Sequence, residues 1–163
     1  MITFIYPKDD WTAAEIVVKM QALAASQNIR VYSPPKNTRR DEREIAMKLA
    51  KTKYSIFLAY DAHTIDEDTA WELKFLSERK TKIYSVVPDV QVDELMKIGI
   101  DENIYPYKYG ERTELITSVK KIIDEIKTKD GKKGDSDLGE TLTFLLLLGM
   151  ILFFLGLIFS KRD

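Results

Sequence analysis

Apolar residues follow two spacings from the first residue to about position 127. Short unbroken runs of Ile, Val, Phe and Tyr are typical of parallel strands covered on both faces. Between them, apolar residues recur at positions i, i+4 and i+7, the spacing of an amphipathic helix. The expected strands are Ile2–Tyr6, Ile29–Tyr32, Tyr54–Tyr60, Ile83–Val87 and the run NIYPY at 103–107.

Strand and helix alternate five times, which predicts an α/β domain over residues 1–127. The expected architecture is flavodoxin-like: a five-stranded parallel sheet in the order 2-1-3-4-5 with helices on both faces. Pro106 in the last strand predicts a sheet edge, because proline has no N–H to donate. The expected helices run from a Thr12–Glu15 capping box to about Gln27, from Asp41 or Thr38 to Lys51, over 69–80, within 92–100, and from Gly110 onward.

The chain continues with segments of a different composition. Residues 128–140, TKDGKKGDSDLGE, have no apolar face and three glycines, which predicts a flexible linker. Residues 141–159 form a run of 19 without a charge. As a helix this run is about 28 Å long, close to the thickness of a bilayer's hydrocarbon core. We therefore expect a transmembrane helix at 141–159, followed by a short basic tail at 160–163.

Basic residues flank the apolar run on both sides, so the positive-inside rule does not decide its orientation. The simplest interpretation is a single-pass, tail-anchored membrane protein with its α/β domain in the cytoplasm. Gly149 and Gly156 are seven residues apart and lie near one face of a helix. Small residues let helices approach closely, so this face is a candidate contact with another copy in a homo-oligomer. Two glycines are also ordinary in a membrane helix.

Composition excludes several classes of function. The formal net charge is −1, from 25 basic and 26 acidic residues, which argues against nucleic acid as a partner. The absence of cysteine excludes disulfides, thiolate metal sites and cysteine nucleophiles. His63 is the single histidine, so histidine metal clusters are excluded and a Ser-His-Asp triad is disfavoured. No metal site is expected.

Glu72 interrupts the apolar arc of the helix expected at 69–80. At 100° per residue it falls between Trp71, Phe75 and Leu76. A buried carboxylate without a partner costs several kcal/mol or changes its pKa, so its position needs a reason. One reason is a capping box between Thr69 and Glu72. The other is a ligand crevice at the carboxyl ends of the strands. The two are compatible.

Several stretches together resemble a Toll/interleukin-1 receptor (TIR) domain over about residues 1–127. They are FIYPKDD after the first strand, a proline-containing loop after the second, IAMKLAKTKYSIFL at 45–58 and TAWELKF at 69–75. The stretch DEDTAWELKFLSERKTKIYSVVPD at 66–89 is also similar to nucleoside 2-deoxyribosyltransferases, in which a glutamate on that helix attacks a ribosyl carbon. In NAD-cleaving TIR domains a glutamate on the same helix is catalytic. Glu72 is the matching position here.

The resemblance implies a nucleotide ligand, either NAD+ as a substrate or a cyclic nucleotide as a messenger, with no permanently bound cofactor. Cleavage of an N-glycosidic bond passes through an oxocarbenium-like state, which a nearby carboxylate stabilises. Aromatic side chains near the strand ends are candidates to stack a base, and cations there are candidates to neutralise a diphosphate. The candidate ligand-binding residues are Tyr6, Lys8, Asp9, Trp11, Arg39, Arg40, Tyr60 and Trp71.

Three functions follow as expectations. The first is a membrane-anchored enzyme that cleaves NAD+ through Glu72 on self-association, as an effector of prokaryotic antiviral defence. The second is a non-enzymatic effector whose domain senses a nucleotide messenger and oligomerises to disrupt the membrane. The third is a membrane adaptor that recruits partners through TIR-like contacts.

Overall fold

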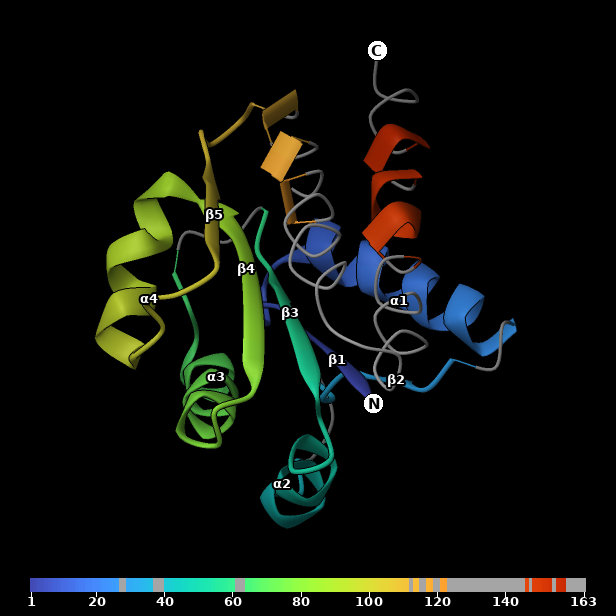
Figure 1. Cartoon of the computed structure of the whole chain (residues 1–163), viewed down its shortest axis with the longest axis vertical. Helices are drawn as coiled ribbons and strands as arrows, with labels where there is room; N and C mark the ends of the chain where they lie inside the picture. Colours follow the sequence, from blue (N-terminus) through green and yellow to red (C-terminus); the bar gives the residue numbers. More distant parts are fainter. Residues whose placement is uncertain are drawn as a thin grey trace, which may run out of the picture.

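The computed structural model of the chain (Figure 1) describes residues 1–26, 29–36, 40–60, 64–111, 113–114, 117–118, 121–122, 146, 148–153 and 155–157. The predicted linker at 128–140 and the basic tail at 160–163 lie outside these residues. The predicted helix after Gly110 is described at 113–114, 117–118 and 121–122, and all of these residues are helical.

A parallel sheet forms the centre of the domain. Its five strands stand in the order β2-β1-β3-β4-β5, and every neighbouring pair is parallel. Both the predicted order and the predicted direction are therefore confirmed. The strands are β1 Ile2–Ile5, β2 Val31–Tyr32, β3 Tyr54–Leu58, β4 Lys82–Pro88 and β5 Ile104–Tyr107.

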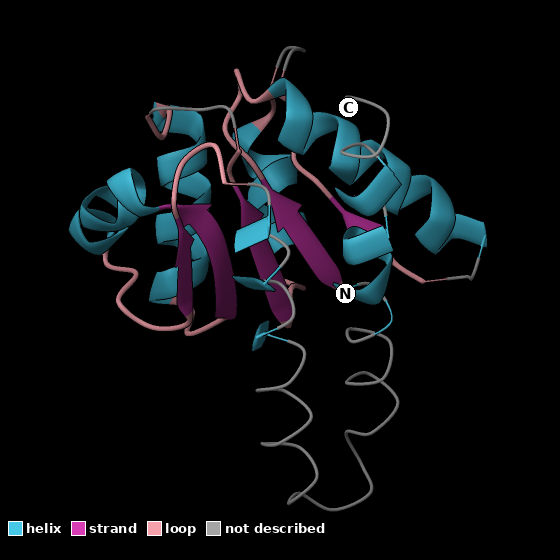
Figure 2. Cartoon of the chain, turned by 90° about the horizontal axis from the view of Figure 1, so that it is seen from above, coloured by secondary structure: helices cyan, strands magenta, loops and turns pink. Residues whose placement is uncertain are grey.

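Helices connect the strands and cover the sheet, as Figures 1 and 2 show. They are α1 Trp11–Ser26, α2 Glu42–Leu49, α3 Glu67–Glu78, the 3₁₀ turn η1 Asp89–Gln91 and α4 Val92–Ile98. Helix α4 is capped by Gly99, whose φ of 92° lies in the left-handed region that favours glycine.

The two-residue alternation of the strands divides the core into two clusters. Phe4 and the apolar residues on β3 and β4 that point to the same face of the sheet pack with α1. Ile5 and the apolar residues that point to the other face pack with α2, α3 and α4. Helices on both faces cover the three central strands β1, β3 and β4, which explains their unbroken apolar runs, whereas the edge strands β2 and β5 are only partly buried. Pro106 lies opposite Val87 on β5, the last strand of the sheet, so the predicted edge position is also confirmed.

Aspartates begin the helices on both sides of the sheet. Asp41 accepts from the amides of Arg43 and Glu44 and caps α2, as predicted. At α1, Asp10 accepts from the amide of Ala13 at 2.8 Å, so the predicted Thr12–Glu15 capping box is wrong. Aspartate is a better N-cap than threonine, and the helix therefore starts at the earlier residue.

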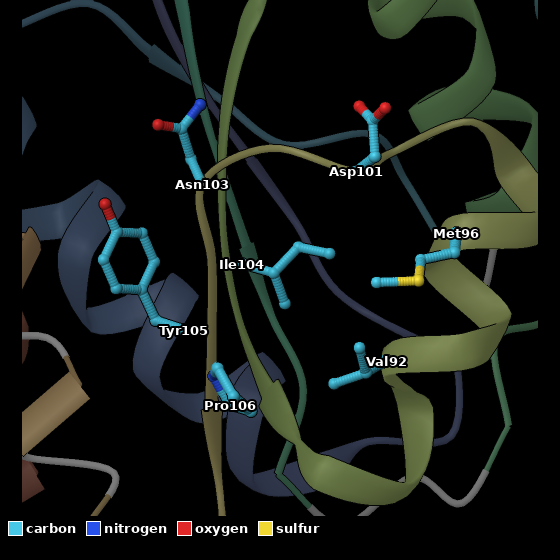
Figure 3. A pocket seen from close by; sticks show the side chains of 7 residues that line it. All are labelled: Val92, Met96, Asp101, Asn103, Ile104, Tyr105 and Pro106. Atoms are coloured by element: carbon cyan, nitrogen blue, oxygen red, sulfur yellow. The ribbon is translucent and has the colours of Figure 1, made fainter.

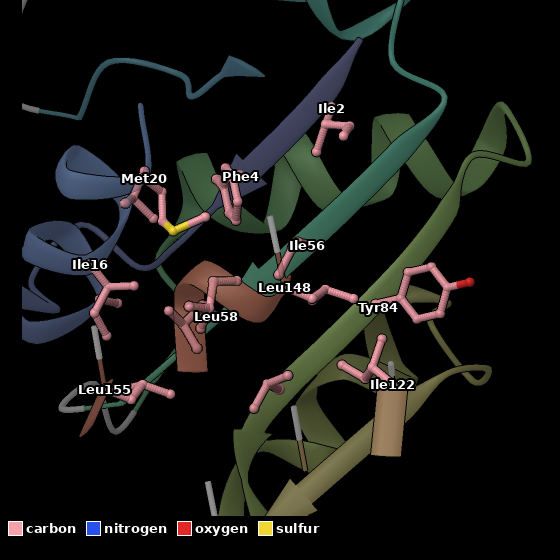
Figure 4. Packing of buried hydrophobic residues seen from close by; sticks show 14 of the residues in the cluster. Ile2, Phe4, Ile16, Met20, Ile56, Leu58, Tyr84, Ile122, Leu148 and Leu155 are labelled. Atoms are coloured by element: carbon pink, nitrogen blue, oxygen red, sulfur yellow. The ribbon is translucent and has the colours of Figure 1, made fainter. Parts of the chain in front are cut away.

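Part of the predicted membrane segment lies against the α1 side of the sheet. The described residues of 146–157 are helical, and three of them are buried in the same cluster as Phe4: Leu148, Ile151 and Leu155. Figure 4 shows Leu148 pointing toward Tyr84 on β4. Within the described residues, no helix combines the length and apolar character needed to cross a membrane. Because the segment 141–159 is described only in part, the transmembrane helix remains a prediction.

Candidate functional site

A charged cluster lies beyond the carboxyl ends of β1, β2 and β3. Tyr6 follows β1 directly, Lys36 and Arg40 belong to the loop after β2, and α3 brings Glu72 from the connection after β3. In the strand order 2-1-3, chain connections leave β1 and β3 toward opposite faces of the sheet. The crevice at such a point is where open α/β sheets bind ligands.

Glu72 is the centre of this cluster. Its side chain has an exposed fraction of 0%, and both carboxylate oxygens contact cations. Lys36 Nζ donates to Oε2 at 2.7 Å, and Arg40 Nη2 donates to Oε1 at 2.7 Å. The carboxylate predicted to be buried is therefore buried with two partners. Its partners are 36 and 32 residues away in the sequence.

The predicted capping box at Thr69 and Glu72 is wrong. Helix α3 begins at Glu67, with Asp66 as its N-cap. Asp66 accepts from the amide of Thr69 at 3.0 Å and from the amide of Lys8 at 2.7 Å. Glu72 lies too far along the helix to reach an N-cap amide, so its position is explained by the cations rather than by capping.

Lys36 joins Glu72 to the start of α3. Its side chain is 2% exposed, and Nζ also donates to the hydroxyl of Thr69 at 2.9 Å. That hydroxyl lies 2.7 Å from Asp66 Oδ2 and 3.1 Å from the carbonyl oxygen of Tyr6. It has one proton and donates it to one of these two acceptors at a time. Nζ also lies 5.6 Å from the centroid of the Tyr6 ring. The ammonium group is therefore held by contacts from three sides.

Arg40 forms the outer boundary of the cluster, with a side chain 11% exposed. Besides Glu72, it contacts Asp68 Oδ2 through Nε at 3.2 Å and donates to the carbonyl of Pro35 at 2.8 Å. An open cavity of about 560 Å³ lies beside it, lined by Arg40, Asp41, Glu42 and Arg43. Arg40 therefore both lines this cavity and contacts the buried carboxylate.

Burial shifts the proton affinities of the cluster. It raises the pKa of the Glu72 carboxyl, and the charges and hydrogen bonds of Lys36 and Arg40 partly offset the rise. Burial lowers the pKa of Lys36, against the opposing effect of Glu72. The pKa of Tyr6 is raised by burial and then by the charge of Glu72, and the same two causes raise the pKa of Tyr32 to about 12. The positive charge of Arg40 favours the ionised form of the Glu72 carboxylate.

The structure brings three of the predicted site residues together: Tyr6, Arg40 and Glu72. Tyr60 also lies at a strand end, but its ring stacks on Tyr107 at 6.4 Å. Trp71 packs against Phe75 at 5.7 Å within the second core cluster.

The side chains of the remaining described ligand-binding candidates, Lys8, Asp9 and Trp11, are exposed. The backbone amide of Lys8 donates to Asp66 in the network. Trp11 is 77% exposed at the start of α1. Arg39 lies outside the described residues.

Lys36 is the residue that sequence reasoning missed. It stands in the loop SPPKNTRRDE, in which the sequence pattern pointed to Arg39 and Arg40 as candidate cations. The available signal was the expectation that Glu72 is buried, because a buried carboxylate requires a cation within reach. A second missed feature is the Asp66 cap, which directly precedes Glu67 and Asp68 in the acidic first turn of α3.

A second cavity lies at the other edge of the sheet. It has a volume of about 430 Å³ and lies between α4 and β5 (Figure 3). Its lining residues are Val92, Met96, Asp101, Asn103, Ile104, Tyr105 and Pro106. None of them belongs to the Glu72 cluster. Among the residues that the structure describes, no group of three or more His, Asp or Glu side chains is arranged to hold a metal ion.

The chain matches no family model, no curated protein and no solved structure. The class of this protein is defined by its own fold and site. It is a five-stranded parallel α/β protein with a buried Lys–Glu–Arg cluster at the carboxyl ends of its strands. Assignment to a particular family remains a proposal based on sequence resemblance.

Proposed function

We propose that this protein is a TIR-like, membrane-tethered effector that binds a nucleotide at the Glu72 cluster and cleaves the N-glycosidic bond of NAD+. The observation that carries the proposal is the placement of Glu72. It is a fully buried carboxylate between two cations, at the strand ends where open α/β sheets bind ligands.

The cluster supplies the charges that this reaction needs. When the bond between ribose C1′ and the nicotinamide nitrogen breaks, the electron pair leaves with nicotinamide and positive charge develops on the sugar. Glu72 stabilises that charge, either as an ion or by bonding to C1′, and water then adds at C1′ with release of a proton. A carboxylate in a buried site interacts strongly with such a charge because screening there is weak.

Arg40 and Lys36 carry the complementary charge for a nucleotide's diphosphate. A guanidinium matches phosphate oxygens in the same two-pronged way as a carboxylate. Arg40 borders the open cavity and also contacts Glu72, so a phosphate group that binds in the cavity would compete with Glu72 for the guanidinium. If Arg40 broke its hydrogen bond with Glu72 and bound a phosphate instead, the Glu72 carboxylate would become accessible to the ribose.

The test measures nicotinamide release by the full-length protein in detergent, with oligomer size followed in the same samples. Glu72→Gln is compared with Glu67→Gln, which removes an exposed carboxylate from the same helix. We expect turnover by Glu72→Gln to fall by a factor on the order of a hundred or more, and Glu67→Gln to act like the parent. All assays are run below the measured melting temperature of each variant. A parent that releases no nicotinamide even when oligomeric overturns the catalytic part of the proposal.

A non-enzymatic sensor is the second candidate, and one observation favours it. Both oxygens of Glu72 are engaged by cations, so the carboxylate is satisfied without a ligand. In this alternative the cluster responds to a nucleotide messenger by rearranging its ion pairs, and the response is assembly rather than cleavage. Binding of a cyclic oligonucleotide, measured by calorimetry, with growth of the oligomer and no nicotinamide release would select the sensor.

A further inference from the structure

The C-terminal apolar segment can be buried either in a lipid bilayer or against the sheet, and its described part is packed against the sheet. Its sequence, 141–159, is an uncharged run long enough as a helix to span a bilayer. In the structure, helical residues of 146–157 lie on the sheet face beside α1. We propose that this segment has two positions, docked on the sheet or inserted into a lipid bilayer, and that insertion uncovers the sheet face. This extends the membrane tether of the proposed function and is independent of its nucleotide chemistry.

In the docked position the segment has one covered and one exposed side. Leu148, Ile151 and Leu155 are buried, and at 100° per residue they fall within about 60° of one another. Leu146, Phe153 and Leu157 are large apolar residues that remain exposed, and their centre lies about 180° from the buried group. Among the described residues of the segment, docking therefore leaves one apolar side exposed to water.

A bilayer would cover both sides of the segment at once. The exposed side contains Phe153 with 62% of its surface accessible, which favours transfer to lipid. Leaving the sheet has an opposing effect, because the docked residues cover part of the cluster that includes Ile16, Val17 and Tyr84. These two effects act in opposite directions, so the presence of lipid decides the position.

The chemistry of the segment identifies lipid as its partner. Lys132 and Lys133 precede the run, and Lys161 and Arg162 follow it. Residues 128–140 also contain Asp130, Asp135, Asp137 and Glu140, so the net basic charge lies in 160–163, after the run. Inserted in a bilayer, Lys161 and Arg162 would lie at the level of the headgroups, where anionic lipids attract them. A second protein copy would need only one apolar face, whereas the uncharged run is apolar around the whole helix.

Single cysteines test the two positions without interference, because the natural chain has no cysteine. The variants are Phe153→Cys on the exposed side of the segment and Ile16→Cys on α1, in the buried cluster that the segment joins, with Val17→Cys as a smaller change in the same cluster. Met47→Cys, exposed on α2 at the opposite face of the sheet, is the control. Labelling by a membrane-impermeant maleimide is measured for the full-length chain, first without lipid and then with vesicles of equal parts phosphatidylethanolamine and phosphatidylglycerol.

Without lipid, we expect fast labelling at positions 153 and 47 and protection at 16 and 17. Vesicles should slow labelling at position 153 by about tenfold or more and speed it at 16 and 17 by a similar factor, since a population shift changes both sites together. Position 47 should not change. Protection of position 153 with continued protection of 16 and 17 would mean that the docked helix only rests on lipid, and this overturns the proposal. Protection of position 153 without lipid would place a second copy on the exposed side and also overturn it.

Discussion

Lys36 Nζ lies 2.7 Å from Glu72 Oε2, and the two side chains are 2% and 0% exposed. An ion pair removed from water this completely depends on its partners for stability, because neither charge can be solvated if the other is removed. The pair joins the loop after β2 to α3, and Arg40 joins the same loop to the same carboxylate. The cluster is therefore structural as well as a candidate site, and this affects how substitutions are interpreted.

Glu72→Gln is expected to destabilise the fold by about 3–5 kcal/mol, because it leaves Lys36 buried opposite a neutral amide. Sequence reasoning alone predicts a nearly unchanged melting temperature for this variant, since glutamine retains much of the size and hydrogen bonding of glutamate. The double variant Lys36→Met/Glu72→Gln removes both charges and should recover most of the loss. Chemical denaturation of both variants and of Glu67→Gln measures the effect. A Glu72→Gln variant as stable as the parent would show that the pair has no electrostatic role in the fold.

Asp66 should make stability depend on pH at the acid end. Burial alone would raise the pKa of Asp66, but hydrogen bonds from Lys8 and Thr69 and the charge of Lys36 outweigh it and lower the pKa below 3.8. A lowered folded-state pKa means that the stabilising effect is present above the unfolded value and is lost as pH falls through the folded value. Asp66→Ala should cost about 0.5–2 kcal/mol near neutral pH, the range for loss of an N-cap.

The measurement for Asp66 is urea denaturation of parent and Asp66→Ala from neutral pH down to acid. The difference between the two should be constant above about pH 5 and shrink below about pH 4. A difference that persists unchanged at low pH would assign the effect to packing rather than to the ionised cap.

Asp10 and Asp9 form a matched pair with opposite expectations. Asp10 is fully buried and accepts from the amides of Ala13 and Tyr60, which ties the start of α1 to the end of β3. Asp10→Ala leaves buried amides without this acceptor and should cost about 1–3 kcal/mol. Asp9→Ala changes an exposed side chain and should stay within about 0.5 kcal/mol of the parent. Equal melting temperatures for the two variants would contradict the role assigned to Asp10.

Gly149 and Gly156 lie on the exposed side of the C-terminal segment, and a Cβ at either position meets nothing within 4 Å. Replacing both with leucine should therefore leave docking on the sheet intact. If the glycine face packs against another copy in the membrane, the same change lowers oligomer content in detergent, because the helices can no longer approach closely. Analytical ultracentrifugation checks this, with membrane insertion followed by flotation with vesicles. Oligomers that persist unchanged would exclude the glycine face as the contact.

Local sequence pattern determined the architecture of this protein. Unbroken apolar runs alternating with amphipathic stretches specify five strands and their helices, and Pro106 marks the edge strand because its ring removes a backbone donor. The burial of Glu72 could also be predicted from the sequence. A helix turns by a fixed angle per residue, so the apolar residues near Glu72 show that it lies on the covered face. These features depend only on residues close together in the chain.

Tertiary structure alone decided which groups meet. Lys36 and Glu72 are 36 residues apart and come together only because the loop after β2 and the start of α3 share one end of the sheet. Asp66 rather than Thr69 caps α3 because its carboxylate also accepts the amide of Lys8 from the connection after β1. The C-terminal run also separates what the sequence determines from what the tertiary structure decides. Leu148, Ile151 and Leu155 are as apolar as a bilayer requires, and the same property lets them pack on a sheet, so composition determines that they are buried and the fold determines against what.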